Sequence, residues 1–169
     1  MSEDGEAVAK SQRVRRLEED GEIAADYLEE LLDIADIGGD IDIDVEHGRA
    51  VVAVVADEAE SGELERLVGA DGEVLDALQE LTRLAVQTRS GERSGLMLDV
   101  AGFREQRKAV LRQQAAEIVA EVRSTGQEVA LEPMNAFERK VIHDAVADAG
   151  LVSESSGTGA DRFVVVRQQ

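Results

Sequence analysis

The sequence predicts an α+β fold in which two small α/β modules are joined by a long helix. Three observations support this prediction. Apolar residues recur at helical spacing in several segments, and in others they alternate with polar residues as in half-buried strands. Residues 103–123 keep the helical spacing throughout and separate two groups of such segments. With 169 residues, the chain is long enough for two small domains.

Residues 1–23 form an acidic N-terminal segment that we expect to be partly disordered, because residues 1–12 are polar and show no periodicity. An amphipathic helix is expected between Arg13 and Ala35. Asp20-Gly21 interrupts its pattern, and glycine is a poor helix former, so a weak point or break is expected there.

A first module is expected over residues 24–101. After the first helix, the pattern predicts two strands, two helices and a third strand, at residues 41–45, 50–56, 64–68, 74–85 and 95–100. His47-Gly48 lies between the first two strands, so His47 is expected to be a turn residue. It has no neighbouring His, Cys or carboxylate at metal-binding spacing.

The segment Gly69-Ala70-Asp71-Gly72 connects the two later helices of this module. A Gly-x-x-Gly between helices lets backbone amides approach a sugar-phosphate chain, and the second helix points its N-terminal dipole at the phosphates. A plain turn between two helices is the alternative interpretation. The carboxylate of Asp71 would repel phosphate, so we expect any nucleic-acid binding here to be weak.

The second module is expected over residues 102–169. Its long helix is followed by predicted strands at 127–131, 151–155 and 162–167, the last two joined by a Gly-rich loop. A helix is predicted between the first two of these strands. Asn135 and Glu138 have the spacing of a capping box, and Gly150 supplies its end. Its expected core residues are Phe137, Val141, Ala145 and Val146.

Arg139 and His143 lie one turn apart on this predicted helix and are expected to point the same way. Asn135 precedes them on the same stripe, and Lys140 is adjacent. A guanidinium can bind a phosphate through two hydrogen bonds, and an imidazole can stack on a base or hydrogen-bond to a backbone oxygen. The alternative interpretation is an ordinary solvated helix face.

The net charge of −19 is unevenly distributed along the chain. Residues 1–102 contain 27 Asp and Glu but only 9 Lys and Arg, whereas residues 103–169 contain 10 and 9. The second part therefore lacks the charge that would repel a polyanion. Its densest basic cluster is on one side of the long helix, at Arg104, Arg107, Lys108 and Arg112.

Several classes of function are not expected. The absence of cysteine excludes disulfides and thiolate metal sites. We expect no signal peptide and no membrane span, because the chain contains no long apolar run, and a soluble cytoplasmic protein is the default. His143 and Asp144 are adjacent on a helix and do not face each other, and no nucleophile or oxyanion site accompanies them, so we do not expect an enzyme. We also expect no bound cofactor.

The run N-A-F-E-R-K-V-I-H at residues 135–143, with the helix end and hairpin that follow, resembles the single-strand nucleic-acid-binding domain named for its Arg-x-x-x-His motif. Residues 24–101 resemble a K-homology (KH) domain, and the run L-V-G-x-x-G-E-x-L-D-A-L-Q resembles the version found in the bacterial Jag family. The order of both modules is similar to the Jag family, also called SpoIIIJ-associated or KhpB proteins. By this resemblance, Arg162 and Arg167 would be supporting phosphate contacts.

The resemblance implies a cytoplasmic RNA-binding protein that acts after transcription, is linked to cell elongation and division, and often pairs with a small single-KH protein. We hypothesise that Arg139 and Lys140 neutralise phosphates of single-stranded RNA, that His143 contacts it, and that the basic cluster on the long helix extends the track to about four to six phosphates. Single-stranded DNA remains an alternative ligand. The alternative function is a protein-interaction adaptor, favoured by Asp71 and the acidic first module.

Overall fold

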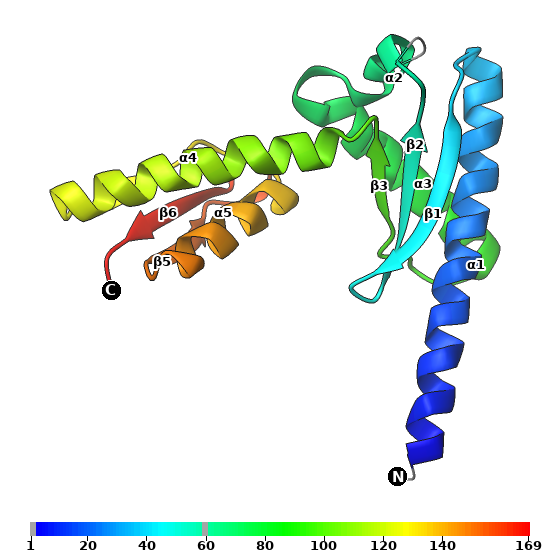
Figure 1. Cartoon of the computed structure of the whole chain (residues 1–169), viewed down its shortest axis with the longest axis horizontal. Coiled ribbons are helices and arrows are strands. Elements are labelled where there is room, and N and C mark those ends of the chain that lie inside the picture. Colours follow the sequence, from blue (N-terminus) through cyan, green and yellow to red (C-terminus); the bar gives the residue numbers. More distant parts are fainter. Residues whose placement is uncertain (1–2, 59–60) are drawn as a thin grey trace. The chain divides into compact units, whose positions relative to one another are not determined.

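A computed structural model of the chain describes residues 3–58 and 61–169 (Figure 1). The chain divides into two compact units, Met1–Phe103 and Arg104–Gln169. Each unit contains helices and one three-stranded sheet, so the predicted α+β class is confirmed. Unit 1 ends at Phe103, and the module boundary between residues 101 and 102 stays a prediction.

Unit 1 has the order helix, strand, strand, helix, helix, strand. Its sheet has the order β1-β2-β3, with the first pair antiparallel and the second parallel. Positive φ angles at His47 and Gly48 form the tight turn between the first two strands, as the sequence predicts. The elements are α1 (Glu3–Ala35), β1 (Asp40–Glu46), β2 (Arg49–Val55), α2 (Ser61–Val68), the 3₁₀ turn η1 (Ala70–Gly72), α3 (Glu73–Ser90) and β3 (Met97–Val100).

The core of unit 1 lies between one face of this sheet and the helices. Alternate residues of the strands face the helices because side chains of a strand point to opposite sides in turn. The opposite face of β1 carries acidic side chains, such as Asp42 and Asp44, which stay exposed. The fully buried members of the core include Leu28, Ala50, Val52, Val54, Leu64, Leu75, Leu98 and Val100.

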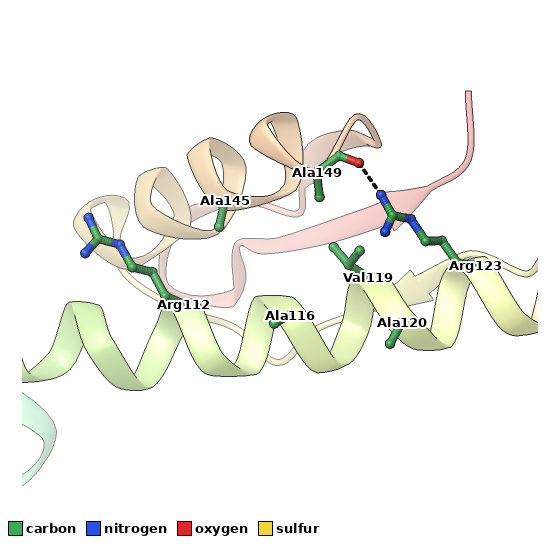
Figure 2. Close-up of a pocket in the computed structure, with 7 residues that line it drawn as sticks. All are labelled: Arg112, Ala116, Val119, Ala120, Arg123, Ala145 and Ala149. Atoms are coloured by element: carbon green, nitrogen blue, oxygen red, sulfur yellow. Dashed lines mark hydrogen bonds between the residues drawn. The ribbon is translucent and has the colours of Figure 1, made fainter.

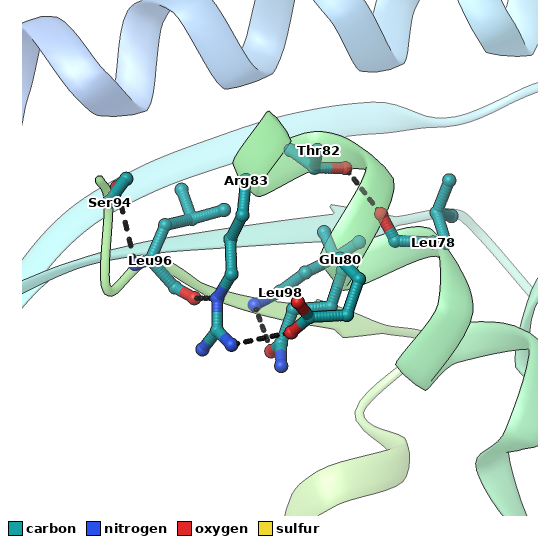
Figure 3. A network of polar contacts seen from close by, with 8 residues as sticks. Leu78, Glu80, Thr82, Arg83, Ser94, Leu96 and Leu98 are labelled. Carbon is teal, nitrogen blue, oxygen red and sulfur yellow. Dashed lines mark hydrogen bonds and ion pairs between the residues drawn. The ribbon is translucent and has the colours of Figure 1, made fainter. Parts of the chain in front are cut away.

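Side chains of α3 fix the position of β3 (Figure 3). Arg83 donates from Nε to the carbonyl of Leu96 at 2.8 Å, and Gln79 Oε1 accepts the amide hydrogen of Leu98 at 3.0 Å. Thr82 is fully buried, and its hydroxyl donates to the carbonyl of Leu78 at 2.7 Å. These bonds satisfy polar groups that would otherwise be costly to bury.

The first helix corrects the prediction for the N-terminal segment. Residues 3–12 are helical, although their side chains from residue 5 onward are exposed, whereas residues 1 and 2 lie outside the described residues. Adding a residue to an existing helix costs far less than starting one, and this stretch extends a helix that is packed further along.

The predicted break at Asp20-Gly21 is wrong, since α1 is continuous there. Asp20 is buried and its carboxylate accepts a hydrogen bond from the Ser94 hydroxyl at 2.8 Å. Gly21 packs against β1: a Cβ at this position would lie 2.5 Å from Cγ2 of Ile43. The glycine therefore allows a close approach of helix and strand and does not end the helix.

The buried face of α3 combines apolar residues with one threonine. Val74, Leu81 and Leu84 are 37%, 51% and 57% exposed. The buried residues of this helix are Leu75, Leu78, Thr82 and Val86. Thr82 can take a core position because its hydroxyl bonds to the carbonyl one turn earlier.

Unit 2 packs two helices with an antiparallel sheet of order β4-β6-β5. Of the predicted core residues, Val146 is fully buried and Phe137 only partly, while Ile142, which the prediction omits, is fully buried. The elements are α4 (Phe103–Thr125), β4 (Val129–Ala130), α5 (Ala136–Asp148), β5 (Val152–Ser156), the 3₁₀ turn η2 (Gly159–Asp161) and β6 (Phe163–Arg167). The fully buried core members include Leu111, Val122, Ile142, Val146, Val164 and Val166.

Both predicted ends of α5 are confirmed. The Asn135 side chain accepts the amide hydrogen of Glu138 at 2.9 Å, and Glu138 Oε2 accepts the amide hydrogen of Asn135 at 3.1 Å, which completes a capping box. At the other end, Gly150 has a φ of 77° and donates to the carbonyl of Ala147. The helix that carries Arg139 and His143 is therefore fixed at both ends.

Candidate nucleic-acid interface

Arg139 and His143 lie one turn apart on α5, but each is held by a different part of unit 2. Arg139 donates from Nη1 to the carbonyl of Met134, 2.7 Å away, in the segment before the helix. The His143 ring lies against β5, with Nδ1 2.6 Å from the hydroxyl of Ser153 and Nε2 2.8 Å from that of Ser155. Both ring nitrogens of His143 therefore already have hydrogen-bonding partners.

The sequence does not predict Ser153 and Ser155 as nucleic-acid contacts. They point to the same side of β5 because they are two residues apart. Their cross-strand partners, Val166 and Val164, are fully buried, so this side of the strand faces the core and α5. Both serines are partly exposed. The local sequence shows alternation here, but the packing of β5 on α5 decides which side chain the serines meet.

Two cations and one carboxylate influence the charge state of His143. Burial lowers its pKa below the ordinary value of 6.5, and the neighbouring Arg139 lowers it further. Asp144 raises the pKa, and Arg162 lowers it by a smaller amount. The imidazole is therefore neutral at pH 7, and the guanidinium groups of Arg139 and Arg162 are both near enough to influence it.

Arg162 and Arg139 are brought together through Met134. The amide of Met134 donates to the carbonyl of Arg162 at 3.0 Å, and its carbonyl accepts from the Arg139 side chain. Arg162 directly precedes β6, and its side chain is exposed. The structure thus assembles Arg139, His143 and Arg162, which the sequence predicts as nucleic-acid contacts, together with the two serines. We call these five residues the α5–β5 face.

Three other predicted contact residues of unit 2 interact with other groups of the protein. Lys140 forms an ion pair with Asp144 at 2.7 Å, and Arg167 forms one with Glu154 at 2.8 Å. Arg167 is at the far end of β6 from Arg162, about 16 Å away along the strand. Asn135 serves as the cap of α5.

The basic cluster on α4 is largely occupied by contacts within unit 2. Arg104 is only 7% exposed and lies over the ring of Phe137, 5.3 Å from its centroid. Arg107 donates from Nε to Glu138 at 2.8 Å, and Lys108 pairs with Glu105 at 3.2 Å. These contacts argue against the continuous basic track that the sequence suggests along the helix.

Arg112, the fourth member of the cluster, lines a shallow groove of about 290 Å³ between α4 and α5 (Figure 2). Arg123 closes the other end and donates to the carbonyl of Ala149 at 2.5 Å. Ala145 and Ala149 face this groove. Because a helix turns by about 100° per residue, the groove lies on the side of α5 opposite His143. The groove is therefore separate from the α5–β5 face. Its remaining lining residues are Ala116, Val119 and Ala120.

The Gly-x-x-Gly segment of unit 1 owes its glycines to packing. Gly69 and Gly72 have φ angles of 71° and 82°. A Cβ at Gly69 would lie 2.4 Å from Val74, and one at Gly72 would lie 2.6 Å from the Phe103 ring. Ala70 and Asp71 are exposed at the tip of the turn. The turn therefore presents a carboxylate, and the geometry that requires glycine is explained without a ligand.

None of the helices formed by the described residues combines the length and apolar composition that crossing a lipid bilayer requires.

Comparison with known proteins places these two units in a family. The family of domains named for the Arg-x-x-x-His motif matches residues 109–168, which include Arg139 and His143. The chain is 32% identical over 155 residues to the RNA-binding protein KhpB of Clostridium symbiosum, an alignment that covers 91% of the chain and 68% of that relative. It is 34% identical over 142 residues to the RNA-binding protein KhpB of Lactiplantibacillus plantarum, which covers 83% of the chain and 42% of the relative.

The RNA-binding protein KhpB of Bacillus subtilis is 35% identical over 103 residues, or 59% of the chain and 50% of the relative. The chain thus spans about two thirds of the first relative and half or less of the other two. Since the identity extends through both units and the second contains an Arg-x-x-x-His domain, the chain belongs to the KhpB, or Jag, family.

Proposed function

We propose that this chain is a non-catalytic protein that binds single-stranded RNA through the α5–β5 face. The observation that carries the proposal is the convergence of Arg139 and Arg162 on a neutral His143. Two guanidinium groups beside one ring provide both phosphate binding and a flat surface for a base. Asp144, the acidic group that acts on His143, is itself paired with Lys140. The names of the relatives support RNA as the ligand.

In this proposal the two arginines neutralise phosphates and His143 contributes the face of its ring. A hydrogen bond from its nitrogens to RNA would have to displace a serine hydroxyl, because both nitrogens are already bonded. The ring face can stack on a base without breaking either bond. Stacking is tolerant of base identity, so sequence preference should be modest.

Unit 1 would contribute as a KH-like module with little charge attraction. Its order of elements is the one that the KH resemblance implies, but Asp71 stands at the tip of the turn where phosphate would approach. We propose that this unit adds shape-dependent contacts to a strand anchored on unit 2. The cellular role would be that implied by the family: cytoplasmic, post-transcriptional, and linked to cell elongation and division.

A small single-KH protein is the proposed protein partner. The observation that supports it is on α3, where Val74, Leu81 and Leu84 are exposed apolar side chains at spacings of seven and three residues. Replacement of Leu81 and Leu84 by lysine should abolish co-sedimentation with such a protein and leave RNA binding by unit 2 unchanged.

The RNA proposal is tested by binding isotherms to a mixed-sequence single-stranded RNA at several salt concentrations. Arg139→Ala should weaken binding about 10-fold, because it removes a charge-assisted contact. Arg162→Ala should weaken it by a comparable factor. Arg167→Ala is the matched control, since it also removes an arginine of β6 but one already paired with Glu154. Its effect should stay within about 2-fold.

The alternative function, a protein-interaction adaptor, gives a different result. It is favoured by the exposed carboxylate of Asp71 and the acidic first unit. If the natural protein shows no salt-dependent RNA binding at about 0.15 M salt, the RNA proposal is wrong and the adaptor is preferred. Cleavage of the RNA in the presence of magnesium would overturn the non-catalytic assignment.

A further inference from the structure

The hydroxyls of Ser153 and Ser155 have opposite hydrogen-bonding roles because they share one imidazole. A neutral histidine has one N–H donor and one nitrogen acceptor. Nδ1 faces Ser153 and Nε2 faces Ser155, so one serine must accept from the ring and the other must donate to it. This holds for either tautomer of His143.

The two serines therefore present different chemistry to a ligand. The serine that accepts from the ring keeps its own hydrogen and can donate it outward. The serine that donates to the ring has only lone pairs left and can only accept. A phosphate oxygen is an acceptor, so it suits the first serine and is repelled by the second. A group that both donates and accepts suits either serine, whichever tautomer His143 adopts.

The ribose 2′-hydroxyl is such a group, and it lies beside the phosphates that Arg139 and Arg162 would hold. It donates and accepts, and it is what allows a protein to distinguish RNA from DNA. Both serines are partly exposed, and β5 is an edge strand of the sheet. His143 fixes both hydroxyls through its two nitrogens.

We propose that one of the two serines, Ser153 or Ser155, positioned by His143, binds a ribose 2′-hydroxyl and gives the α5–β5 face a preference for RNA over DNA. This inference rests on the proposed RNA-binding function and adds to it the part of the nucleotide that is recognised. The arginines would contribute equally to both polymers, since RNA and DNA share the phosphate.

The test compares three labelled strands of one sequence near neutral pH: RNA, DNA with deoxyuridine in place of thymidine, and 2′-O-methyl RNA. The natural protein should bind RNA about 5- to 10-fold more tightly than either other strand, as expected for one buried hydrogen bond to a hydroxyl. At least one of Ser153→Ala and Ser155→Ala should reduce that ratio to about 2-fold or less by weakening RNA binding alone.

Three controls separate this role from others. Ser156→Ala removes a hydroxyl from the same strand on the opposite face, paired with Phe163, and should leave the ratio unchanged. Ser155→Thr keeps a hydroxyl and should retain the preference if Ser155→Ala loses it. Arg139→Ala should weaken RNA and DNA binding by the same factor. The ring nitrogen chemical shifts of His143 report on the serine bonds in the free protein.

The outcomes distinguish this inference from the function on which it rests. Equal affinity of the natural protein for RNA and DNA, both lowered by Arg139→Ala, would overturn the ribose contact and leave the nucleic-acid interface in place. A preference for RNA that survives both serine-to-alanine changes would overturn it too. Absence of binding to all three strands would contradict the proposed function itself.

Discussion

Arg107 donates from Nε to Glu138 Oε1 at 2.8 Å, while Oε2 of the same carboxylate accepts the amide hydrogen of Asn135. The Glu138 side chain is only 9% exposed, so its charge needs this partner. One carboxylate thus connects α4 to the first turn of α5, the helix that carries Arg139. The sequence suggests Arg107 as a nucleic-acid contact, whereas the structure gives it a role inside unit 2.

Arg107→Ala should therefore destabilise unit 2. The change leaves a largely buried carboxylate without its cation, which costs about 2 kcal/mol when allowance is made for the partial exposure of the arginine. Chemical denaturation followed by circular dichroism measures this loss. Lys108→Ala is the control, because its pair with Glu105 is exposed and should contribute less than about 0.5 kcal/mol.

The same variant distinguishes a structural role from a binding role. At a temperature where it remains folded, Arg107→Ala should bind RNA within about 2-fold of the natural protein. Unchanged stability with a large loss of RNA affinity would show that Arg107 contacts phosphate instead.

The salt dependence of RNA binding should be shallow. The sequence suggests about four to six phosphate contacts, for which the slope of log K against log salt would be about −2.8 to −4.2. In the structure, Arg104 is buried, and Arg107, Lys108, Lys140 and Arg167 are paired with carboxylates. Two cations, Arg139 and Arg162, remain on the α5–β5 face, so we expect a slope of about −1.4. A steeper slope would mean that some of these ion pairs open to bind RNA.

Gly72→Ala should destabilise unit 1 by about 3 kcal/mol. The residue has a φ of 82°, which is strained for alanine, and the added Cβ would lie 2.6 Å from the Phe103 ring. Gly91→Ala is the matched control. Gly91 has a φ of 79° at the end of α3, but a Cβ added there would have no atom within 4 Å, so the change should cost only about 1–2 kcal/mol. Equal losses of unfolding free energy in the two variants would show that the contact with Phe103 does not contribute to the destabilisation.

The sequence predicts well those parts of the fold that depend on short-range patterns. The alternation at residues 41–45 predicts β1, and the spacing of Asn135 and Glu138 predicts the start of α5 with its capping box. Each depends on residues a few positions apart, so no knowledge of the tertiary fold is needed.

The prediction errors arise where a residue far along the chain determines the local structure or the burial of a side chain. Gly21 resembles a helix break until Ile43 is placed against it. Thr82 is polar, yet it takes a core position on α3 because its hydroxyl bonds within its own helix. At the site, Arg139 and His143 follow from one motif, whereas Ser153 and Ser155 are chosen by the register of β5 against α5. Which cations are paired is likewise a property of the assembled unit.

Unit 2 should lose stability as the pH falls, and His143 should account for part of the loss. Its pKa is lowered in the folded protein by burial and by Arg139, while the unfolded chain titrates near the ordinary value of about 6.5. Below that value the unfolded state binds more protons than the folded state. The contribution of His143 is therefore fully present above about pH 6.5 and is lost as the pH falls through the lower, folded value.

His143→Gln removes this titration, so the difference in unfolding free energy between the natural protein and the variant should shrink between about pH 7 and about pH 5. Comparing the two proteins at each pH cancels the carboxylates that titrate in both. A difference that grows on acidification would mean that protonated His143 is stabilised in the folded unit, and that Asp144 outweighs the two arginines beside the ring.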